Sequence, residues 1–140
     1  MYKEILAIIG KQSKCVRLKV GALLVKDDRI ISTGWNGTPS KLQNCCDFFK
    51  DKDSKYIEEN HKNFSRTNEI HAEQNCIAYA ARNGISTNES ILYVSISPCR
   101  DCSKLIIAAN IKSVYYVTKY DRETDGLTIL ENAGIIVSQI

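Results

Sequence analysis

The sequence predicts an α/β fold, a three-layer α/β/α sandwich around a five-stranded mixed sheet. Short apolar runs rich in β-branched residues alternate along the chain with segments of helical periodicity. Two of these runs are neighbours joined by a pair of aspartates, which predicts a hairpin. The later runs are separated by helical segments, an alternation that is typical of a layered α/β domain.

The expected elements can be placed in order along the chain. Residues 37–67 show no clear period and are too long for an ordinary connection, so this segment is expected to be functional or held together locally. The other segments predict a helix over about 2–13, strands at 21–26 and 29–34, a helix at 71–82, a strand at 91–96, a helix at 100–110, a strand at 113–118, a helix at 125–132 and a strand at 135–138.

Composition limits the class of protein. With 140 residues, 44% of them hydrophobic, the chain is expected to form one domain over residues 1–140 with a substantial core. The net charge of +3 is spread over interspersed acidic and basic residues, which favours a small anionic substrate over nucleic acid.

The cysteines are expected to be reduced. No apolar run approaches the roughly 20 residues of a membrane span, and the amino terminus lacks a signal-peptide pattern. We therefore expect a cytoplasmic protein with no membrane partner. In that compartment the six cysteines are interpreted as metal ligands or small core residues: Cys15, Cys45, Cys46, Cys76, Cys99 and Cys102.

Two fragments carry the chemistry, His71-Ala72-Glu73 and Pro98-Cys99-Arg100-Asp101-Cys102. Together they match the signature in which one His and two Cys bind zinc beside a Glu that is not a ligand. Three ligands, His71, Cys99 and Cys102, leave one zinc position for water, and Glu73 is free to move protons. The alternative is a closed four-ligand zinc knuckle, in which Glu73 would have no role.

Both fragments are predicted at helix beginnings, where unpaired N–H groups and the helix dipole favour thiolates. Cys99 and Cys102 are three residues apart and can bind one metal from the first turn of a helix. His71 and Glu73 are two residues apart and would not share a face in mid-helix, so this pair requires an irregular or first turn.

Over nearly its whole length the sequence resembles the deoxycytidylate (dCMP) deaminases, including those of bacteriophages. The resemblance implies a cytidine deaminase-like fold and the zinc-dependent hydrolysis of dCMP to dUMP and ammonia, which supplies dUMP for dTMP synthesis, in the host cytoplasm if the chain is phage-encoded. The matching stretches are Ser13-Lys14-Cys15, Val20-Gly21-Ala22, Gly34-Trp35-Asn36-Gly37-Thr38-Pro39, Asn44-Cys45-Cys46-Asp47, Asn68-Glu69-Ile70-His71-Ala72-Glu73, Ser97-Pro98-Cys99 and Ala133-Gly134-Ile135.

The resemblance also implies how substrate is held. Asn36 would bind the deoxyribose, and Ala72 and Ser97 would line the base pocket through backbone groups. Trp35 replaces the usual Tyr, and either ring could pack a flat face near the pocket. Tyr120 is a candidate to stack on or border the nucleotide, the alternative being a half-buried residue at a strand end.

A second zinc site is implied for the long polar segment. The residues that match such a site in phage dCMP deaminases are Cys15, Cys45, His61 and Glu69, and four protein ligands would make it closed and structural. A loop of about 30 residues does not readily build its own core, so a metal would supply the ordering energy. Cys46 is an alternative ligand. The other interpretation is that these cysteines are buried packing residues, as Cys76 is expected to be.

Regulation and assembly are implied by the resemblance alone. It suggests a hexamer that dCTP with Mg²⁺ activates and dTTP inhibits. The regulatory contacts would fall near Gly21 and Gly37, and Tyr79 and Arg82 lie on a helix expected to meet a neighbouring subunit. Arg82 could instead simply complement the negative end of its helix.

Three other functions remain open. The chain could also deaminate dCTP, it could act on tRNA adenosine or single-stranded DNA with the same zinc chemistry, or it could be a non-catalytic zinc module. The presumed second zinc site and the absence of a Lys- and Arg-rich groove argue against the nucleic-acid substrates.

Overall fold

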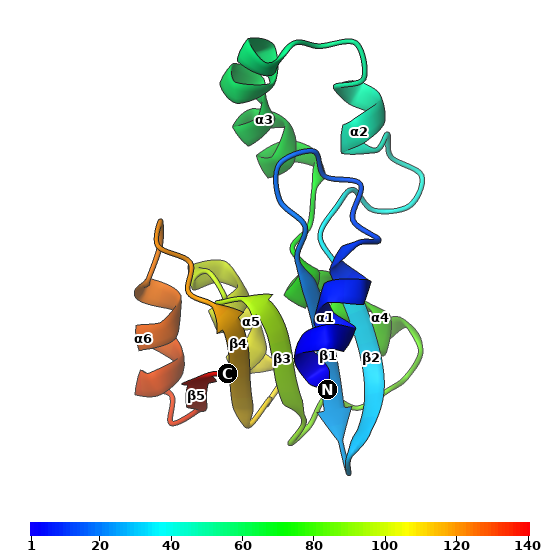
Figure 1. The fold of residues 1–140 in the computed structure, drawn as a ribbon. Helices are drawn as coiled ribbons and strands as arrows, with labels where there is room; N and C mark the ends of the chain where they lie inside the picture. Colours follow the sequence, from blue (N-terminus) through cyan, green and yellow to red (C-terminus); the bar gives the residue numbers. More distant parts are fainter.

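The computed structural model describes residues 1–140 and contains one five-stranded sheet (Figure 1). The strand order is β2-β1-β3-β4-β5, where β1 pairs antiparallel with β2 and β3, and the β3–β4 and β4–β5 pairs are parallel. The predicted mixed sheet is therefore confirmed. The strands are β1 Gly21–Lys26, β2 Arg29–Trp35, β3 Ile91–Ile96, β4 Ser113–Thr118 and β5 Ile136–Gln139.

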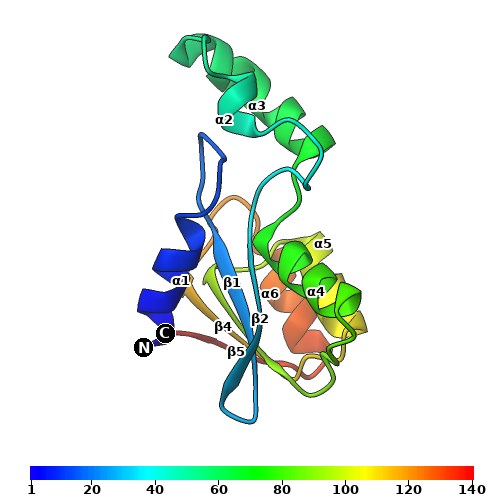
Figure 2. The same ribbon diagram turned by 90° about the vertical axis from the view of Figure 1, so that its right-hand side faces the viewer.

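Helices cover both faces of this sheet, so the three-layer architecture is also confirmed. Figure 2 shows α1 (Tyr2–Gly10) on one face and α4 (Ala72–Arg82), α5 (Arg100–Ala108) and α6 (Asp125–Asn132) on the other. Because side chains alternate along a strand, β1 contributes Leu23 to the cluster beside α1 and Leu24 to the larger core beneath α4 and α5. No helix joins the length and the apolar composition that a membrane crossing requires.

Several predicted boundaries move by a few residues, and three elements show it clearly. The first helix ends at Gly10, α5 ends at Ala108, and the last strand runs over 136–139. Asn110 adopts a left-handed φ of 55°, which closes the end of α5. Gly134 has a φ of 79°, and the Ile135 N–H donates to the Leu130 carbonyl, so Ile135 belongs to the helix ending and not to β5.

Residues 37–67 were expected to lack regular structure, and this expectation was wrong. They contain α2 (Cys45–Phe48) and most of α3 (Ser54–Asn68), which project beyond one end of the sheet (Figures 1 and 2). The Asp53 side chain caps α3 by accepting from the Tyr56 N–H at 2.8 Å. Helical periodicity was missed because this helix is mainly polar and carries few apolar side chains to mark a face.

The segment is also held together locally, as expected, by a small core that it shares with Cys15. Cys15, Cys45, Phe49 and Phe64 are buried together, and Ile57 packs against them. Phe64 makes edge contact with Phe49, with ring centroids 5.3 Å apart. This aromatic cluster holds α2 and α3 together and brings two of the six cysteines into the same interior.

Candidate active site

His71, Cys99 and Cys102 converge where two helices begin. His71 is the N-cap of α4 and Cys99 the N-cap of α5, and both have extended backbone angles. The His71 Nδ1 atom lies 3.5 Å from the Cys99 Sγ and 3.3 Å from the Cys102 Sγ. The sequence therefore placed all three residues correctly at helix beginnings, and the fold brings the two fragments together.

This spacing fits a metal ion. With Zn–S near 2.3 Å and Zn–N near 2.0–2.1 Å, two ligands on a zinc tetrahedron are roughly 3.5 Å apart, close to the separations found here. His71 is exposed, Cys99 is half-buried and Cys102 is buried, so the cluster opens to the surface on one side. Three convergent donors with an open side match the arrangement in which zinc retains a position for water.

Glu73 lies directly behind this cluster. It is the second residue of α4, which meets the requirement that the His-Ala-Glu fragment occupy a first turn. The side chain is almost fully buried, and this burial raises the pKa of Glu73 to about 7, against a smaller lowering effect from His71. A carboxyl group that titrates near neutrality can both accept and release a proton at that pH.

The pKa values of the two cysteines in this cluster are shifted in opposite directions. The Cys102 thiol hydrogen-bonds to Cys99, and together with His71 this lowers the pKa of Cys99 to about 4. The same contact and burial raise the pKa of Cys102. The pKa of His71 is raised, first by its hydrogen bond with Cys99. Cys99 is thus the thiolate of the pair, the form in which sulfur binds metal.

A second cluster lies where the loop after α1 meets α2 and α3. The Cys15 Sγ is 3.3 Å from the His61 Nε2 and 3.6 Å from the Glu69 Oε1, and the latter two atoms are 3.5 Å apart. The Cys45 thiol belongs to the same group, in which all the donor atoms lie within 4.8 Å of one another. Cys46, the alternative ligand, is not part of it and instead contacts Asp47.

The donor set of this second cluster also fits zinc, and the cluster is closed. The Glu69 side chain is only 2% exposed, and its Oε2 atom has no hydrogen-bond partner. A buried carboxylate oxygen without a partner costs free energy unless an ion neutralises it. Burial raises the pKa of Cys15 and raises that of Cys45 to about 12, and a bound cation would favour the thiolate form of both.

Two of the residues expected to bind substrate lie within two residues of a metal ligand in the chain, and a third, Tyr120, is hydrogen-bonded to one of them. Ala72 and Ser97 are buried beside the ligands, and the Ser97 Oγ accepts from the Tyr120 N–H at 2.7 Å. The amide of Asn36 bridges two backbone groups, accepting from the Val20 N–H and donating to the Leu18 carbonyl, both at 2.8 Å. Asn36 therefore fixes the segment before β1.

Three of the four residues expected in regulation line one hollow. Gly37, Tyr79 and Arg82 border a cavity of about 460 Å³ between β2, the turn that follows it and α4. The Arg82 guanidinium lies 5.2 Å from the centre of the Tyr79 ring, and Trp35 completes the aromatic lining. Gly21 is not there: it is buried against α1, where a Cβ would collide with the Leu6 carbonyl.

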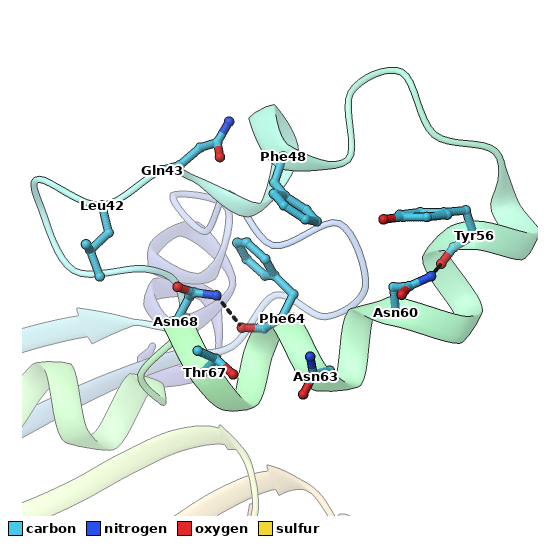
Figure 3. A pocket seen from close by; sticks show the side chains of 9 residues that line it. All are labelled: Leu42, Gln43, Phe48, Tyr56, Asn60, Asn63, Phe64, Thr67 and Asn68. Carbon is cyan, nitrogen blue, oxygen red and sulfur yellow. Dashed lines mark hydrogen bonds between the residues drawn. The ribbon is translucent and has the colours of Figure 1, made fainter.

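Another cavity, of about 300 Å³, lies between α3 and the segment that carries α2 (Figure 3). Phe48 and Phe64 stack within it at 4.6 Å, and Asn60 and Asn68 use their side chains to donate to carbonyls of the preceding helical turn. It contains none of the clustered metal-type ligands. The reactive chemistry therefore belongs to the His71 cluster and not to this hollow.

Sequence reasoning missed three residues that hold the site. The Gln74 Oε1 accepts from the His71 N–H at 2.7 Å, a contact that Gln three residues after a helix cap could have indicated. Asn75 donates to the Trp35 carbonyl at 2.9 Å and ties α4 to the end of β2. The Glu123 carboxylate accepts from the Arg100 N–H at 2.7 Å, and nothing in the local sequence indicates this contact.

Comparison with known proteins supports the interpretation of these clusters as zinc-binding sites. Residues 1–118 match the model of the family described as "Cytidine and deoxycytidylate deaminase zinc-binding region". The chain belongs to this family of deaminases. The match includes both fragments of the His71 cluster and all four residues of the second cluster, so this deaminase carries the zinc-binding region that defines the family.

Individual relatives are similar to this chain over most of their length. This deaminase is 37% identical to the deoxycytidylate deaminase of Enterobacteria phage T4, with 98% of the chain and 86% of the phage protein covered. The dCMP deaminase of cyanophage S-TIM5, solved with dCMP and dUMP, superposes with a TM-score of 0.81 at 36% identity, covering 99% and 93% of the two chains. The apo form of that enzyme gives a TM-score of 0.79. The cytidine deaminase-like fold is thereby confirmed.

Proposed function

We propose that this chain is a dCMP deaminase that converts dCMP and water to dUMP and ammonia. The observation that carries the proposal is the convergence of His71, Cys99 and Cys102 beside the buried Glu73. The similarity to phage enzymes named for this reaction, over nearly the whole chain, supports the same substrate. The product would supply the precursor of dTMP synthesis, in the host cytoplasm if the chain is phage-encoded.

The residues of the first cluster would hold zinc and leave one side open for water. Zinc in such a site lowers the pKa of the water that attacks the base. Glu73 would take a proton from that water and pass it to the ring nitrogen, and would then carry the proton of the added hydroxyl to the amino group, which leaves as ammonia. A pKa of about 7 suits this double task, because the carboxyl group must be deprotonated at one step and protonated at the next.

The other contacts would position the nucleotide. Ala72 and Ser97 would present backbone groups to the base, and Tyr120 would border it from the loop after β4. Asn36 would bind the deoxyribose, a role compatible with its backbone contacts because a carbonyl-type oxygen accepts more than one hydrogen bond.

We also propose that Cys15, Cys45, His61 and Glu69 bind a second, structural zinc ion. The Glu69 Oε2 atom without a partner and the convergence of the four donor atoms within 4.8 Å of one another support it. Ile70, between Glu69 and His71, makes two backbone hydrogen bonds with Gly37. The second site would in this way brace the chain just before the catalytic ligand.

Regulation is a further part of the proposal. The exposed Arg82, beside the Tyr79 ring in an open hollow, suits an anionic nucleotide or a neighbouring subunit. We propose that dCTP with Mg²⁺ activates and dTTP inhibits, in a hexamer whose subunits meet near α4.

A substrate comparison tests the proposed reaction. Purified zinc-loaded protein is incubated with dCMP, dCTP, deoxycytidine and CMP, and ammonia release and the loss of cytosine absorbance are followed. The expected result is that dCMP has the highest kcat/KM. Equal or faster turnover of dCTP would favour the bifunctional alternative, and no turnover of any of the four would refute the proposal.

A further inference from the structure

One carboxylate joins the beginnings of two helices beside the zinc-binding cysteines. The Glu123 Oε2 accepts from the Arg100 N–H at 2.7 Å, and its Oε1 accepts from the Gly126 N–H at 3.1 Å. Arg100 is the first residue of α5 and Gly126 the second residue of α6. We call this pair of contacts the Glu123 bridge.

The Glu123 bridge supplies a hydrogen-bond acceptor at the start of α5, where the metal-binding Cys99 does not. A residue at an N-cap ordinarily uses its side chain to satisfy the first free N–H groups of the helix. Cys99 occupies the N-cap of α5 but makes no such bond, and its Sγ faces His71 instead. Glu123, 23 residues further along the chain, supplies an acceptor to Arg100 that Cys99 does not.

The start of α6 is packed directly on the same turn. A Cβ at Gly126 would collide with the Pro98 carbonyl and come within 2.8 Å of the Cys99 carbonyl. There is thus room only for glycine where α6 meets the ligand turn. The Glu123 bridge fixes this contact by a charged hydrogen-bond acceptor, which is stronger than a neutral one.

The bridge also anchors the loop that carries Tyr120. This loop, residues 119–124, connects β4 to α6 and is coloured orange in Figure 1. At one end the Tyr120 N–H donates to the Ser97 Oγ at 2.7 Å, and at the other Glu123 binds the start of α5. Both anchors flank the Ser97-Pro98-Cys99 turn, so the loop is tied to the rim of the zinc cluster at two points.

We propose that Glu123 is a positioning residue of the deaminase: it holds the 119–124 loop against the Cys99 turn so that Tyr120 lies at the border of the nucleotide pocket. This inference rests on the proposed function, because it assigns the loop to substrate binding. Glu123 touches neither the metal ligands' donor atoms nor Glu73 in the structure, so its effect should fall on substrate binding and not on the chemical step.

The test compares Glu123→Ala and Glu123→Gln with Glu131→Gln, which alters an exposed carboxylate of α6 that makes no side-chain hydrogen bond. For zinc-loaded Glu123→Ala we expect the KM for dCMP to rise about five- to tenfold, with kcat within about twofold of wild type. Amide hydrogen exchange over residues 119–126 should become at least about tenfold faster while zinc content stays unchanged. Glu123→Gln retains one acceptor oxygen and should lie between Glu123→Ala and wild type, and Glu131→Gln should match wild type.

Several results would overturn the inference. Faster exchange with an unchanged KM would mean that the bridge exists but does not position substrate. Unchanged exchange would mean that the bridge does not order the loop, and loss of zinc would reveal a structural role in metal binding instead. A wild-type chain that does not turn over dCMP would refute the proposed function and this inference together, whereas turnover with an unaltered KM in Glu123→Ala refutes the inference alone.

Discussion

At the scale of single residues, Glu73 has the property that the proposed chemistry needs most directly. It is charged when deprotonated, almost fully buried, and adjacent to three metal-type ligands, one His and two Cys. Burying a carboxyl group costs free energy even when it is hydrogen-bonded, and a structural zinc knuckle has no use for such a group. Its retention behind an open ligand cluster therefore favours an enzyme over a closed zinc module.

The Glu73→Gln variant separates these two functions. Glutamine preserves the shape of the side chain but removes the group that moves protons, so we expect zinc content to be unchanged and deamination of dCMP to fall by about 10²- to 10⁴-fold. Metal analysis and ammonia release measure the two quantities on the same sample. Full activity in this variant would contradict the mechanism, and Glu131→Gln, an exposed carboxylate on α6, is the matched control.

Two cysteines outside the clusters should differ sharply in reactivity. Cys76 is fully buried in the main core, and this burial raises the pKa of its thiol to about 12, so it stays protonated at pH 8. Cys46 is partly exposed. In the native protein we expect iodoacetamide to modify Cys46 and to reach Cys76 only after unfolding, as measured by peptide mass spectrometry. Comparable labelling of both would mean that α4 is not packed on the sheet, and Cys46→Ser identifies the peptide that is labelled.

At the scale of elements, the sequence indicated the strands and the buried helices well because their side chains alternate or recur at fixed periods. Asp27 and Asp28, with φ of 52° and 59°, form the hairpin turn that their position between two strands suggested. Helix α3 was missed for the converse reason. Its stability depends on the Asp53 cap and on a few contacts around Phe64 that only the folded chain brings together.

The second cluster offers a test of how α3 is held. If it binds a structural zinc, His61→Ala should lower the zinc content from about two ions per chain to about one and lower the Tm by about 5 °C or more. Amide exchange in α3 should quicken, since the helix loses its link to Cys15. Lys62→Ala, the exposed neighbour on the same helix, should leave metal content and Tm nearly unchanged. Unaltered zinc content in His61→Ala would exclude His61 as a ligand.

At the scale of the whole molecule, the residues of both ligand clusters could be named from the sequence. How the fold brings the members of each cluster into contact could not. His71 and Cys99 are 28 residues apart, and no period connects them. Only the order β1-β3-β4 in the sheet, with α4 and α5 packed on one face, brings their helix beginnings together. The Asn75 and Glu123 contacts are long-range in the same way, which explains why motifs alone did not predict them, whereas the Gln74 contact is local and follows the pattern of a helix capping box.

The cavity beside α4, lined by Trp35, Gly37, Tyr79 and Arg82, allows the proposed regulation and the proposed hexamer to be tested together. Arg82 is an exposed cation within a cavity that also has two exposed aromatic rings, Trp35 and Tyr79, a surface that suits a nucleotide's base and phosphates or a second subunit. At subsaturating dCMP with Mg²⁺, we expect dCTP to raise the rate and dTTP to lower it. In Arg82→Ala the concentration of either effector needed for half of its effect should rise by about three- to tenfold, because a charge-assisted contact is lost.

Light scattering on the same samples measures assembly, and a hexamer would have about six times the 15.8 kDa mass of the chain. Lys62→Ala, remote from the hollow's lining, is the control for a general loss of positive charge. Rates that stay flat with both nucleotides would refute the regulation, and a normal effector response in Arg82→Ala would exclude this hollow as its site. A monomer that still responds to dCTP would separate the two properties, because the effector would then act within one chain and not through contacts between subunits.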